Sequence, residues 1–449
     1  MKRQYYVFLL TSILFQVGLE TFAWDFRIQN DEGIMLYYNY INDGKELELT
    51  YDTYYGESEY YSNKLETIKI PSEVVYMNRT RKVTRIGKHA FWYVTCLKKV
   101  ILPETIKAID DYAFYECDQL KELILPNSLE TIGKKAFESC HFNSLFIGEN
   151  MKSLGDHASG ASLIVDTIYV KDMKSFLNID YKNINFFNTY GEALLYDSSG
   201  SIISNLIIPE GVTKIGRSLR GCKSIKTVTI PETITEIDDY AFRACINLTE
   251  VNMHDNIKTI GEEAFCGCNI SEIKFPKNLT SIKSGAFGGC KFKSIDLPNS
   301  LVCAYGFRSC ESLAEITLPE KIEKFNFEFC DNLLTVVSKI INPKETPCGY
   351  TWTSGYNSGF SNAFSRNTLM NATLYVPIGT KEKYMEAEGW KDFVFIEEMS
   401  PTGILPIGES NKTFEIKRYM INGRQISQPQ KGINIIKMSD GTSKKIYVK

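Results

Sequence analysis

The chain has 449 residues, of which 43% are hydrophobic and 12% aromatic, values typical of a folded protein and not of a disordered one. Its 51 Lys and Arg residues nearly balance 54 Asp and Glu residues, so the net charge at pH 7 is −3. This balance argues against a nucleic acid or an anionic membrane as partner, because such partners select strongly basic surfaces.

The first 23 residues have the organisation of a secretory signal peptide. Lys2-Arg3 precede an apolar run from Tyr5 to Val17, and Thr21-Phe22-Ala23 offers small residues for a cleavage site. The run is too short for a transmembrane helix, and no later segment approaches about 18 uninterrupted apolar residues. We therefore expect an exported chain that begins near Trp24 and has no membrane span once the signal is removed. The alternative is a buried N-terminal strand or helix.

Residues 81–397 contain an internal repeat of about 23 residues. With the Ala-Phe pair of each unit in register, the pattern reads AFxxCxxLxxLxLPxxLxxIGxxAF, and nine units follow from Ala90-Phe91 onward. One step runs from Ala113-Phe114 to Ala136-Phe137, and the last steps contract to 20 residues. Apolar positions that stay in phase over nine units indicate a repeat architecture.

The repeat predicts a solenoid of stacked coils. Val228 and Ile230 alternate with Thr227 and Thr229, which is the pattern of a short strand with one buried face. The proline that follows ends the strand because it has no N–H to donate. The AFxxC stretch has the spacing of about one helical turn. We expect a leucine-rich-repeat solenoid with one short parallel strand and a helical turn or irregular segment in each coil.

One position after the second apolar pair of the repeat is almost always glycine or aspartate. Its occupants are Gly87, Asp110, Gly133, Gly155, Gly216, Asp238, Gly261 and Lys283. Two interpretations remain open for this position. It is either a turn residue with positive φ or the N-cap of a following helical turn.

Eight of the twelve cysteines occupy one repeat position: Cys117, Cys140, Cys222, Cys245, Cys268, Cys290, Cys310 and Cys330. Side chains stacked at one position lie about 5 Å apart, farther than the ~3.5–4.5 Å between Cβ atoms that a disulfide needs. We therefore expect a ladder of buried thiols, with disulfides or a metal site as alternatives. The remaining four are out of register, and the sequence leaves their redox state open: Cys96, Cys266, Cys303 and Cys348.

Residues 398–449 differ from the repeats. Tyr419–Ile426 predicts a hairpin around Asn-Gly, and Gly432–Met438 with Lys444–Val448 predicts a second hairpin around Asp-Gly. We expect a small C-terminal β segment. It resembles a truncated sorting domain of type IX secretion, and the alternative is a small β cap or sandwich fragment.

The repeats resemble the BspA-like leucine-rich repeats of Bacteroidales surface proteins. Phrases such as ITEIDDYAFRACINLTEV and LPNSLETIGKKAFESC carry the resemblance, which covers residues 81–397. It implies an N-terminal β cap at 24–80, an elongated repeat near 159–205, and a capping repeat near 363–397 preceded by a Gly/Ser/Asn-rich loop at 343–362. The cap holds tyrosines that either pack on the first coil or form an adhesive patch: Tyr51, Tyr54, Tyr55, Tyr60 and Tyr61.

No motif in the sequence predicts catalysis, a cofactor or a metal site. The four histidines form no HExxH, no Ser or Cys lies in a nucleophile motif, and no nucleotide-binding glycine motif occurs. The acidic pairs Asp110-Asp111 and Asp238-Asp239 are adjacent in turns, whereas catalytic carboxylates converge across a substrate. We expect a chain that is not an enzyme, and the elongated repeat is the one place where a catalytic site could be concealed.

Binding is then expected on the outward side chains of the solenoid strands, the usual recognition surface of such repeats. The candidates are Glu122, Ile124, Thr227, Thr229, Glu250, Asn252, Glu272, Lys274, Asp296, Glu315 and Thr317. We interpret the chain as a secreted or cell-surface binding or adhesion protein, a monomer whose ligand is an extracellular protein or glycan. The alternative is a structural spacer or envelope assembly component, in which these side chains form an ordinary solvated sheet face.

Overall fold

The computed structural model describes residues 24–51, 66–155, 164–181, 193–354 and 357–399, and in the C-terminal segment 415–420, 424–426, 428, 430, 432–438 and 443–448. The predicted signal peptide lies outside the described residues, as do four of the five tyrosines of the cap and the two predicted C-terminal turns. The chain divides into two units: unit 1 holds residues 1–204 and 215–225, and unit 2 holds 205–214 and 226–449.

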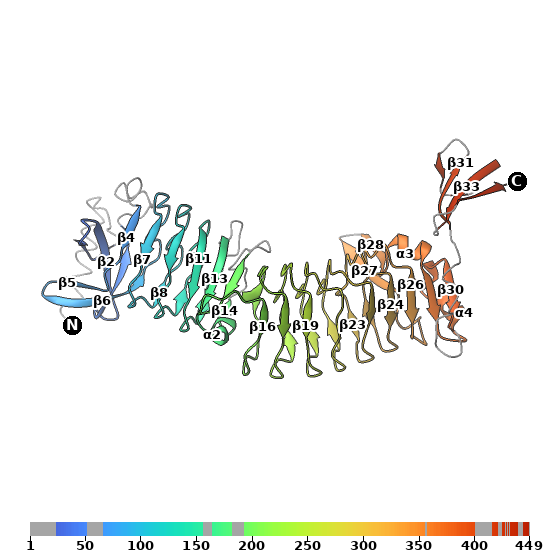
Figure 1. The fold of residues 1–449 in the computed structure, drawn as a ribbon, viewed down its shortest axis with the longest axis horizontal. Helices are drawn as coiled ribbons and strands as arrows, with labels where there is room; N and C mark the ends of the chain where they lie inside the picture. Colours follow the sequence, from blue (N-terminus) through green and yellow to red (C-terminus); the bar gives the residue numbers. More distant parts are fainter. Residues whose placement is uncertain are drawn as a thin grey trace. The chain divides into compact units, whose positions relative to one another are not determined.

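Unit 1 is built from coils that each add one strand to each of two β-sheets (Figure 1). The first sheet has the order β15-β13-β11-β9-β7-β4, and its strands are parallel. Its register pairs Lys99 with Glu122 and Glu122 with Ser144, which are steps of 23 and 22 residues. The strands of this sheet are β4 (Thr67–Lys69), β7 (Lys99–Ile101), β9 (Glu122–Ile124), β11 (His141–Ile147), β13 (Ile164–Val170) and β15 (Leu194–Tyr196).

The second sheet of unit 1 begins with antiparallel strands and continues with parallel ones. Its order is β1-β2-β3-β6-β8-β10-β12-β14, with β5 paired to β6. The pairs β1–β2, β2–β3 and β5–β6 are antiparallel, whereas β3–β6 and all later pairs are parallel. The strands are β1 (Phe26–Gln29), β2 (Met35–Ile41), β3 (Glu46–Thr50), β5 (Glu73–Tyr76), β6 (Arg79–Ile86), β8 (Ala108–Ile109), β10 (Thr131–Ile132), β12 (Ser153–Leu154) and β14 (Asp180–Tyr181).

Unit 2 repeats this construction over its own coils. Its first strands form the sheets β16-β17-β19 and β22-β24-β26-β29-β30, and its second strands form the sheet β18-β20-β21-β23-β25. The bounds are β16 (Asn205–Ile207), β17 (Thr227–Thr229), β18 (Glu236–Ile237), β19 (Glu250–Asn252), β20 (Thr259–Ile260), β21 (Ser281–Ile282), β22 (Ser294–Asp296), β23 (Cys303–Ala304), β24 (Glu315–Leu318), β25 (Lys324–Phe325), β26 (Thr335–Ser338), β29 (Thr373–Val376) and β30 (Phe395–Glu398).

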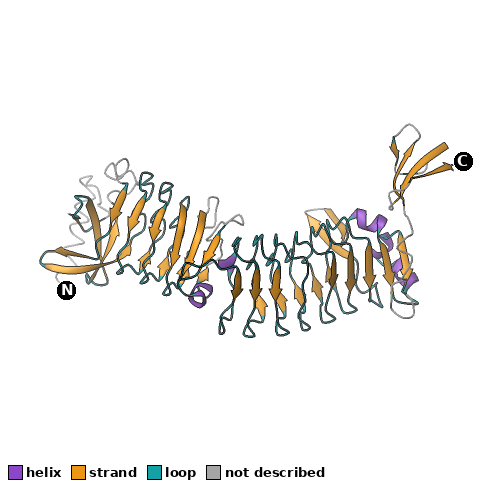
Figure 2. Ribbon diagram, viewed as in Figure 1, coloured by secondary structure: helices purple, strands orange, loops and turns teal. Residues whose placement is uncertain are grey.

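Helices are short and few among the described residues (Figure 2). Unit 1 holds α2 (Met173–Leu177), capped by Asp172, and the 3₁₀ helix η1 (Arg217–Leu219). Unit 2 holds α3 (Arg366–Asn371), α4 (Lys381–Glu386) and the 3₁₀ helix η2 (Trp390–Asp392). Within the described part of the chain, none of these helices is long and apolar enough to cross a membrane.

The predicted solenoid is confirmed, and the structure adds a second strand of two residues to most coils. The AFxxC segment is the irregular alternative in most coils, whereas at Ser218-Leu219 it contains the 3₁₀ helix η1. Residues on both sides of the six Ala-Phe pairs from Ala90-Phe91 to Ala286-Phe287 have positive φ, as at Tyr112 (57°) and Glu116 (60°). Side chains with a Cβ leave the right-handed helical region there. Backbone bonds run from coil to coil through this turn, for example from the Phe114 N–H to the Ala136 carbonyl at 2.8 Å.

The glycine and aspartate position serves neither of the two expected functions at Gly133, Gly155 and Gly261, whereas Gly216 is the N-cap of the 3₁₀ helix η1. Gly133, Gly155 and Gly261 are not among the residues with positive φ. A Cβ on Gly133 would lie 2.4 Å from the Asp111 nitrogen, and one on Gly155 would lie 2.3 Å from the Gly133 carbonyl carbon. Glycine is therefore needed at these two coils because the backbone of the preceding coil lies so close.

Stacked phenylalanines and thiols fill the core between the sheets. In unit 2 the rings of Phe242, Phe265 and Phe287 are fully buried and stack at 5.3 Å between centroids. The eight cysteines of the ladder are buried, as predicted, and all twelve cysteines are thiols. Several donate to the carbonyl oxygen of the phenylalanine one coil earlier, as Cys268 does to Phe242 at 3.2 Å. Burial raises the pKa of Cys290 to about 12, so this thiol stays neutral.

In the C-terminal part of unit 2 the predicted loop proves to contain two strands, whereas the predicted C-terminal hairpins are confirmed. The predicted loop at 343–362 contains an antiparallel hairpin of β27 (Gly349–Ser354) and β28 (Asn357–Asn362). The two predicted C-terminal hairpins are present as pairs in one antiparallel sheet of order β32-β31-β33-β34. Its strands are β31 (Glu415–Met420), β32 (Gln425–Ile426), β33 (Gly432–Met438) and β34 (Ser443–Val448).

Candidate binding surface

Seven of the nine predicted binding residues of unit 2 lie on two separate parallel sheets. Thr227 pairs with Glu250 and Thr229 with Asn252 on one sheet, and Asp296 pairs with Thr317 on the other, where Glu315 pairs with Ser294. The strand positions between them, such as Val228 and Val251, point into the core. The predicted alternation of inward and outward side chains therefore holds on these strands.

Glu272 and Lys274 are exposed, but they lie in an irregular segment and not in a strand. The surface that the unit 2 residues form is polar, and several of its groups bond one another. The Asn252 amide donates to Glu250 at 2.9 Å, and the Thr227 hydroxyl donates to Asn205 at 3.2 Å. These properties fit a solvated sheet face.

At the same strand position unit 1 carries apolar side chains, which unit 2 matches at Ile207 of β16 but not at Thr229 or Asn252. The register places Ile101, Ile124, Phe146, Tyr169 and Tyr196 side by side on β7, β9, β11, β13 and β15. We call these five side chains the apolar row. Ile101 is 43% exposed, Ile124 64% and Phe146 40%, and the two tyrosines are half-buried. Glu122, also predicted, begins β9 two residues before Ile124.

The rings of the apolar row are stacked. The centroids of Phe146 and Tyr169 are 4.5 Å apart with planes 8° from parallel, and those of Tyr169 and Tyr196 are 5.1 Å apart at 28°. Parallel strands in register lie about 4.8 Å apart, so identical positions on successive coils place rings directly over one another. The backbone thus holds these side chains in place without a ligand.

A cavity of about 490 Å³ lies along the apolar row and is bounded on one side by the turn 197–200. Asp197 holds this turn, because its Oδ1 accepts from the Ser199 N–H at 2.9 Å, the Ser199 hydroxyl at 2.6 Å and the Ser201 N–H at 3.0 Å. The Ser199 hydroxyl is the main reason why the pKa of Asp197 is lowered. On another side Lys171 forms an ion pair with Glu149 at 3.1 Å. The cavity therefore has an apolar floor and a charged rim.

Of the five residues in the apolar row, the sequence analysis identified only Ile124 as a binding candidate. The signal was present, since Ile101, Phe146, Tyr169 and Tyr196 occupy the repeat position of Thr229 and Asn252. Tyr169 and Tyr196 were hard to detect because the repeats around 159–205 depart from the consensus spacing, so their register cannot be assigned by counting residues. Ile101 and Phe146 lie in coils of regular spacing and could have been found by counting.

The titratable residues considered from the sequence serve the solenoid itself. Asp110 pairs with Arg85 at 3.1 Å and Asp111 accepts from the Lys134 N–H at 2.6 Å, each to a neighbouring coil. His141 contacts Asp166 at 3.1 Å on the surface. No group of three or more His, Cys, Asp or Glu side chains that could hold a metal occurs in the described ranges. His157 lies outside them.

Comparisons with known proteins concern the repeats. A family model described as "BspA type Leucine rich repeat region" matches in six copies, over residues 84–189, 163–262, 195–301 and 235–345. No curated protein sequence matches the chain.

Three solved structures of bacterial proteins are similar to this chain. One is a leucine-rich repeat protein from Bacteroides ovatus, with 16% identity and a TM-score of 0.44 over 84% of this chain and 100% of that chain. The pneumococcal vaccine antigen PcpA has 15% identity and a TM-score of 0.47 over 84% of this chain and 99% of that chain. A leucine-rich cell surface protein from Faecalibacterium prausnitzii has 18% identity and a TM-score of 0.37 over 70% of this chain and 95% of that chain.

Proposed function

The chain belongs to the BspA-type leucine-rich repeat family, and on this premise we propose that it is an exported, monomeric binding protein that takes a protein ligand on the apolar row of unit 1. Export is supported by Lys2-Arg3 and the apolar run to Val17. The proposal involves no catalysis.

The exposed apolar row is the observation that carries the proposal. Ile124 leaves 64% of its surface in water although the core beneath it is already closed by Leu123. Soluble monomers rarely expose contiguous large apolar side chains unless these meet a partner. Aromatic side chains held rigidly in this way also lose little conformational entropy on binding.

The geometry of the rings favours a protein over a glycan. Sugars pack their C–H groups on the flat faces of aromatic rings, but the facing sides of Phe146 and Tyr169 cover each other at 4.5 Å. The row presents ring edges together with the aliphatic side chains of Ile101 and Ile124. Such a surface is complementary to apolar and aromatic side chains of a protein, which pack readily against ring edges.

The polar outward positions of β17, β19, β22 and β24 support a second role for unit 2, that of a spacer, although Ile207 on β16 is 73% exposed. The polar outward groups hydrogen-bond to one another, as Asn252 does to Glu250, and so leave little desolvated surface to offer a ligand. In this division of roles unit 1 binds and unit 2 sets the reach of the protein.

The test uses the mature chain on a panel of purified extracellular matrix proteins, bacterial surface proteins and glycans. The double variant Ile124→Ser/Phe146→Ser removes the apolar row, and Thr229→Ala is the matched control at the same strand position in unit 2. We expect saturable binding to a protein target that falls at least tenfold in the double variant and is unchanged in the control, with circular dichroism showing both folded. Binding to glycans alone, binding to nothing on the panel, or equal binding by the double variant contradicts the proposal.

A further inference from the structure

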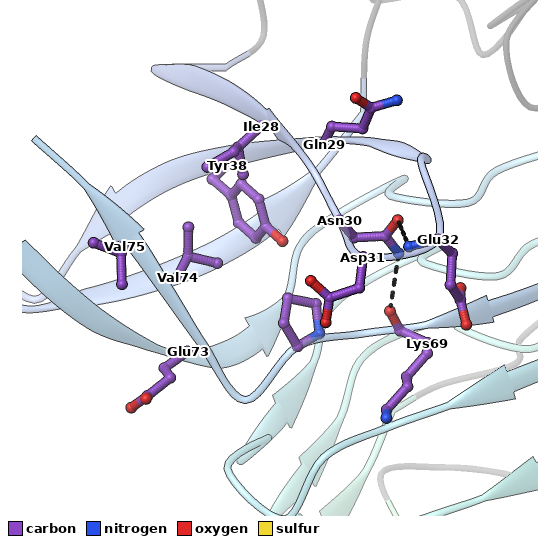
Figure 3. A pocket seen from close by; sticks show the side chains of 11 residues that line it. Ile28, Gln29, Asn30, Asp31, Glu32, Tyr38, Lys69, Glu73, Val74 and Val75 are labelled. Atoms are coloured by element: carbon purple, nitrogen blue, oxygen red, sulfur yellow. Dashed lines mark hydrogen bonds between the residues drawn. The ribbon is translucent and has the colours of Figure 1, made fainter.

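A second cavity lies at the other end of unit 1, among the strands β1, β2, β4 and β5 (Figure 3). Its volume is about 280 Å³, just below the range of ordinary ligand pockets and enough for one extended side chain. Ile28, Pro71 and Val74 give it an apolar floor, and Val74 is buried. This cavity shares no residue with the one along the apolar row.

The hydroxyl of Tyr38 is the unusual feature of this cavity. Tyr38 has no exposed surface, and its Oη makes no hydrogen bond with any described residue. Stacking of the ring on Phe26, at 5.4 Å between centroids, holds it in place. Burial raises the pKa of Tyr38, so the hydroxyl remains protonated and neutral. Buried polar groups in folded proteins are normally bonded, so an unbonded hydroxyl that lines a cavity indicates a missing partner.

Asp31 provides a charge next to this hydroxyl. Its carboxylate has no hydrogen bond or ion pair within the part of the chain that the structure describes. Figure 3 shows the Asp31 carboxylate and the Tyr38 hydroxyl directed toward the same space, whereas the Lys69 ammonium points away from it. Glu32 and Glu73 at the rim add negative potential.

The two amide side chains of the cavity already bond within the chain. The Asn30 oxygen accepts from the N–H groups of Glu32 at 3.0 Å and Ile34 at 2.8 Å, and the Gln29 amide donates to the Gly33 carbonyl at 2.6 Å. Above the apolar floor a ligand therefore meets the Asp31 carboxylate and the Tyr38 hydroxyl, with Glu32 and Glu73 at the rim.

We propose that this cavity binds an alkylammonium group, the chemistry of a lysine side chain on a protein partner. The methylene stem lies on Ile28 and Val74, and the ammonium donates to the Asp31 carboxylate and to the Tyr38 oxygen. An ammonium group rotates freely to reach two acceptors that are not coplanar, whereas a guanidinium is a flat fork suited to a single carboxylate. The site is independent of the apolar row and holds or fails separately from the proposed function.

Equilibrium dialysis of the full chain against Nα-acetyl-lysine methylamide tests the proposal, with the norleucine analogue as a probe of equal length that lacks the charge. We expect saturable binding of one lysine derivative per chain and no saturable binding of the norleucine analogue. Tyr38→Phe should weaken binding about tenfold, because it removes one hydrogen bond to a charged group. Asp31→Asn should weaken it at least as much, and Asp43→Asn, an exposed turn carboxylate in the same sheet region, should have no effect.

Three results would overturn the proposal. Equal binding of the norleucine analogue would show that the cavity is an apolar pocket, and binding of n-butylammonium without binding of the lysine derivative would exclude a protein side chain. Unchanged binding in Tyr38→Phe and Asp31→Asn would place the ligand elsewhere. The thermal midpoint of empty Tyr38→Phe gives a separate criterion. It should equal or exceed that of the parent chain, since no hydrogen bond is lost, and a lower midpoint would mean that the hydroxyl already has a partner.

Discussion

Replacing Gly133 by alanine should destabilise unit 1, although alanine is the better residue in most backbone conformations. Gly133 is not among the residues with positive φ, so alanine suffers no backbone strain there. Its Cβ would nevertheless lie 2.4 Å from the Asp111 nitrogen and 2.6 Å from the Asp110 carbonyl carbon. Ordinary contacts of this kind begin near 3.4 Å, so the two coils must separate by about 1 Å at this point.

The loss of stability can be estimated from the packing and the hydrogen bond that this separation of the coils disturbs. The Gly133 N–H donates to the Ile109 carbonyl at 2.7 Å, within the pairing of β8 and β10. Overpacking costs about 1–3 kcal/mol and weakening one backbone hydrogen bond about 1 kcal/mol, so we expect a loss of about 3 kcal/mol. For a unit of this size the thermal midpoint should then fall by roughly 6–12 °C, which circular dichroism during heating measures directly.

Asp110→Ala is the matched control, because Asp110 occupies the same repeat position one coil earlier and the change adds no atom. It removes a partly exposed ion pair with Arg85 at 3.1 Å, worth about 1 kcal/mol or less. If Gly133→Ala lowers the midpoint no more than Asp110→Ala, the close approach of coils does not explain the glycine. A raised midpoint would be a stronger refutation, because it would show that alanine gains its usual entropic advantage of about 0.4–1 kcal/mol unopposed.

Two further predictions concern the thiols. At pH 8 a reagent that attacks thiolates should label at most the half-buried Cys96, Cys266 and Cys303 in the native chain. After denaturation it should label all twelve cysteines. Labelling of the cysteine ladder in the folded protein would contradict the burial of those thiols. Because burial raises the pKa of Cys290 from 9.0 to about 12, its contribution to stability is complete below about pH 9 and is lost as the pH rises toward 12. Urea unfolding at pH 8 and pH 11 should therefore give a smaller difference for Cys290→Ala than for the parent chain, and equal differences would count against this assignment.

The stacking of the coils could be predicted from the sequence, because each coil contacts the next through side chains at the same repeat position. Once Val228 and Ile230 are known to recur every coil, their stacking and the burial of the cysteine ladder follow from strand geometry. The two-residue strands could not be predicted, because a pair such as Thr131-Ile132 is too short to show a period of two. The reason for glycine at position 133 was also inaccessible, since a close approach of backbones leaves no trace in a local pattern.

The sequence predicted which strand positions form the candidate surface, but it did not reveal that the surface of unit 1 is apolar. The outward strand positions of β17, β19, β22 and β24 were identified correctly, although Thr227 and Thr317 are half-buried and not fully exposed. The apolar row depends on the register of β13 and β15, which lie where the repeat length changes. The cavity at Tyr38 could not be predicted from the sequence. Its identification requires knowing that Asp31, in the turn between β1 and β2, and Tyr38 on β2 are directed toward the same space.

The inward and outward positions of the strands differ in whether the stability of the solenoid requires an apolar side chain. The inward neighbours are buried aliphatic residues in both units, for example Leu123 in unit 1 and Val228 in unit 2, and these close the core. The outward residue one position later is Ile124 in unit 1 and Thr229 in unit 2, on strands of the same length and pairing. Stability of the coil therefore does not require an apolar residue there. Covering the row would release about 25 cal/mol for each Å² of apolar surface removed from water, a gain that only a partner can provide.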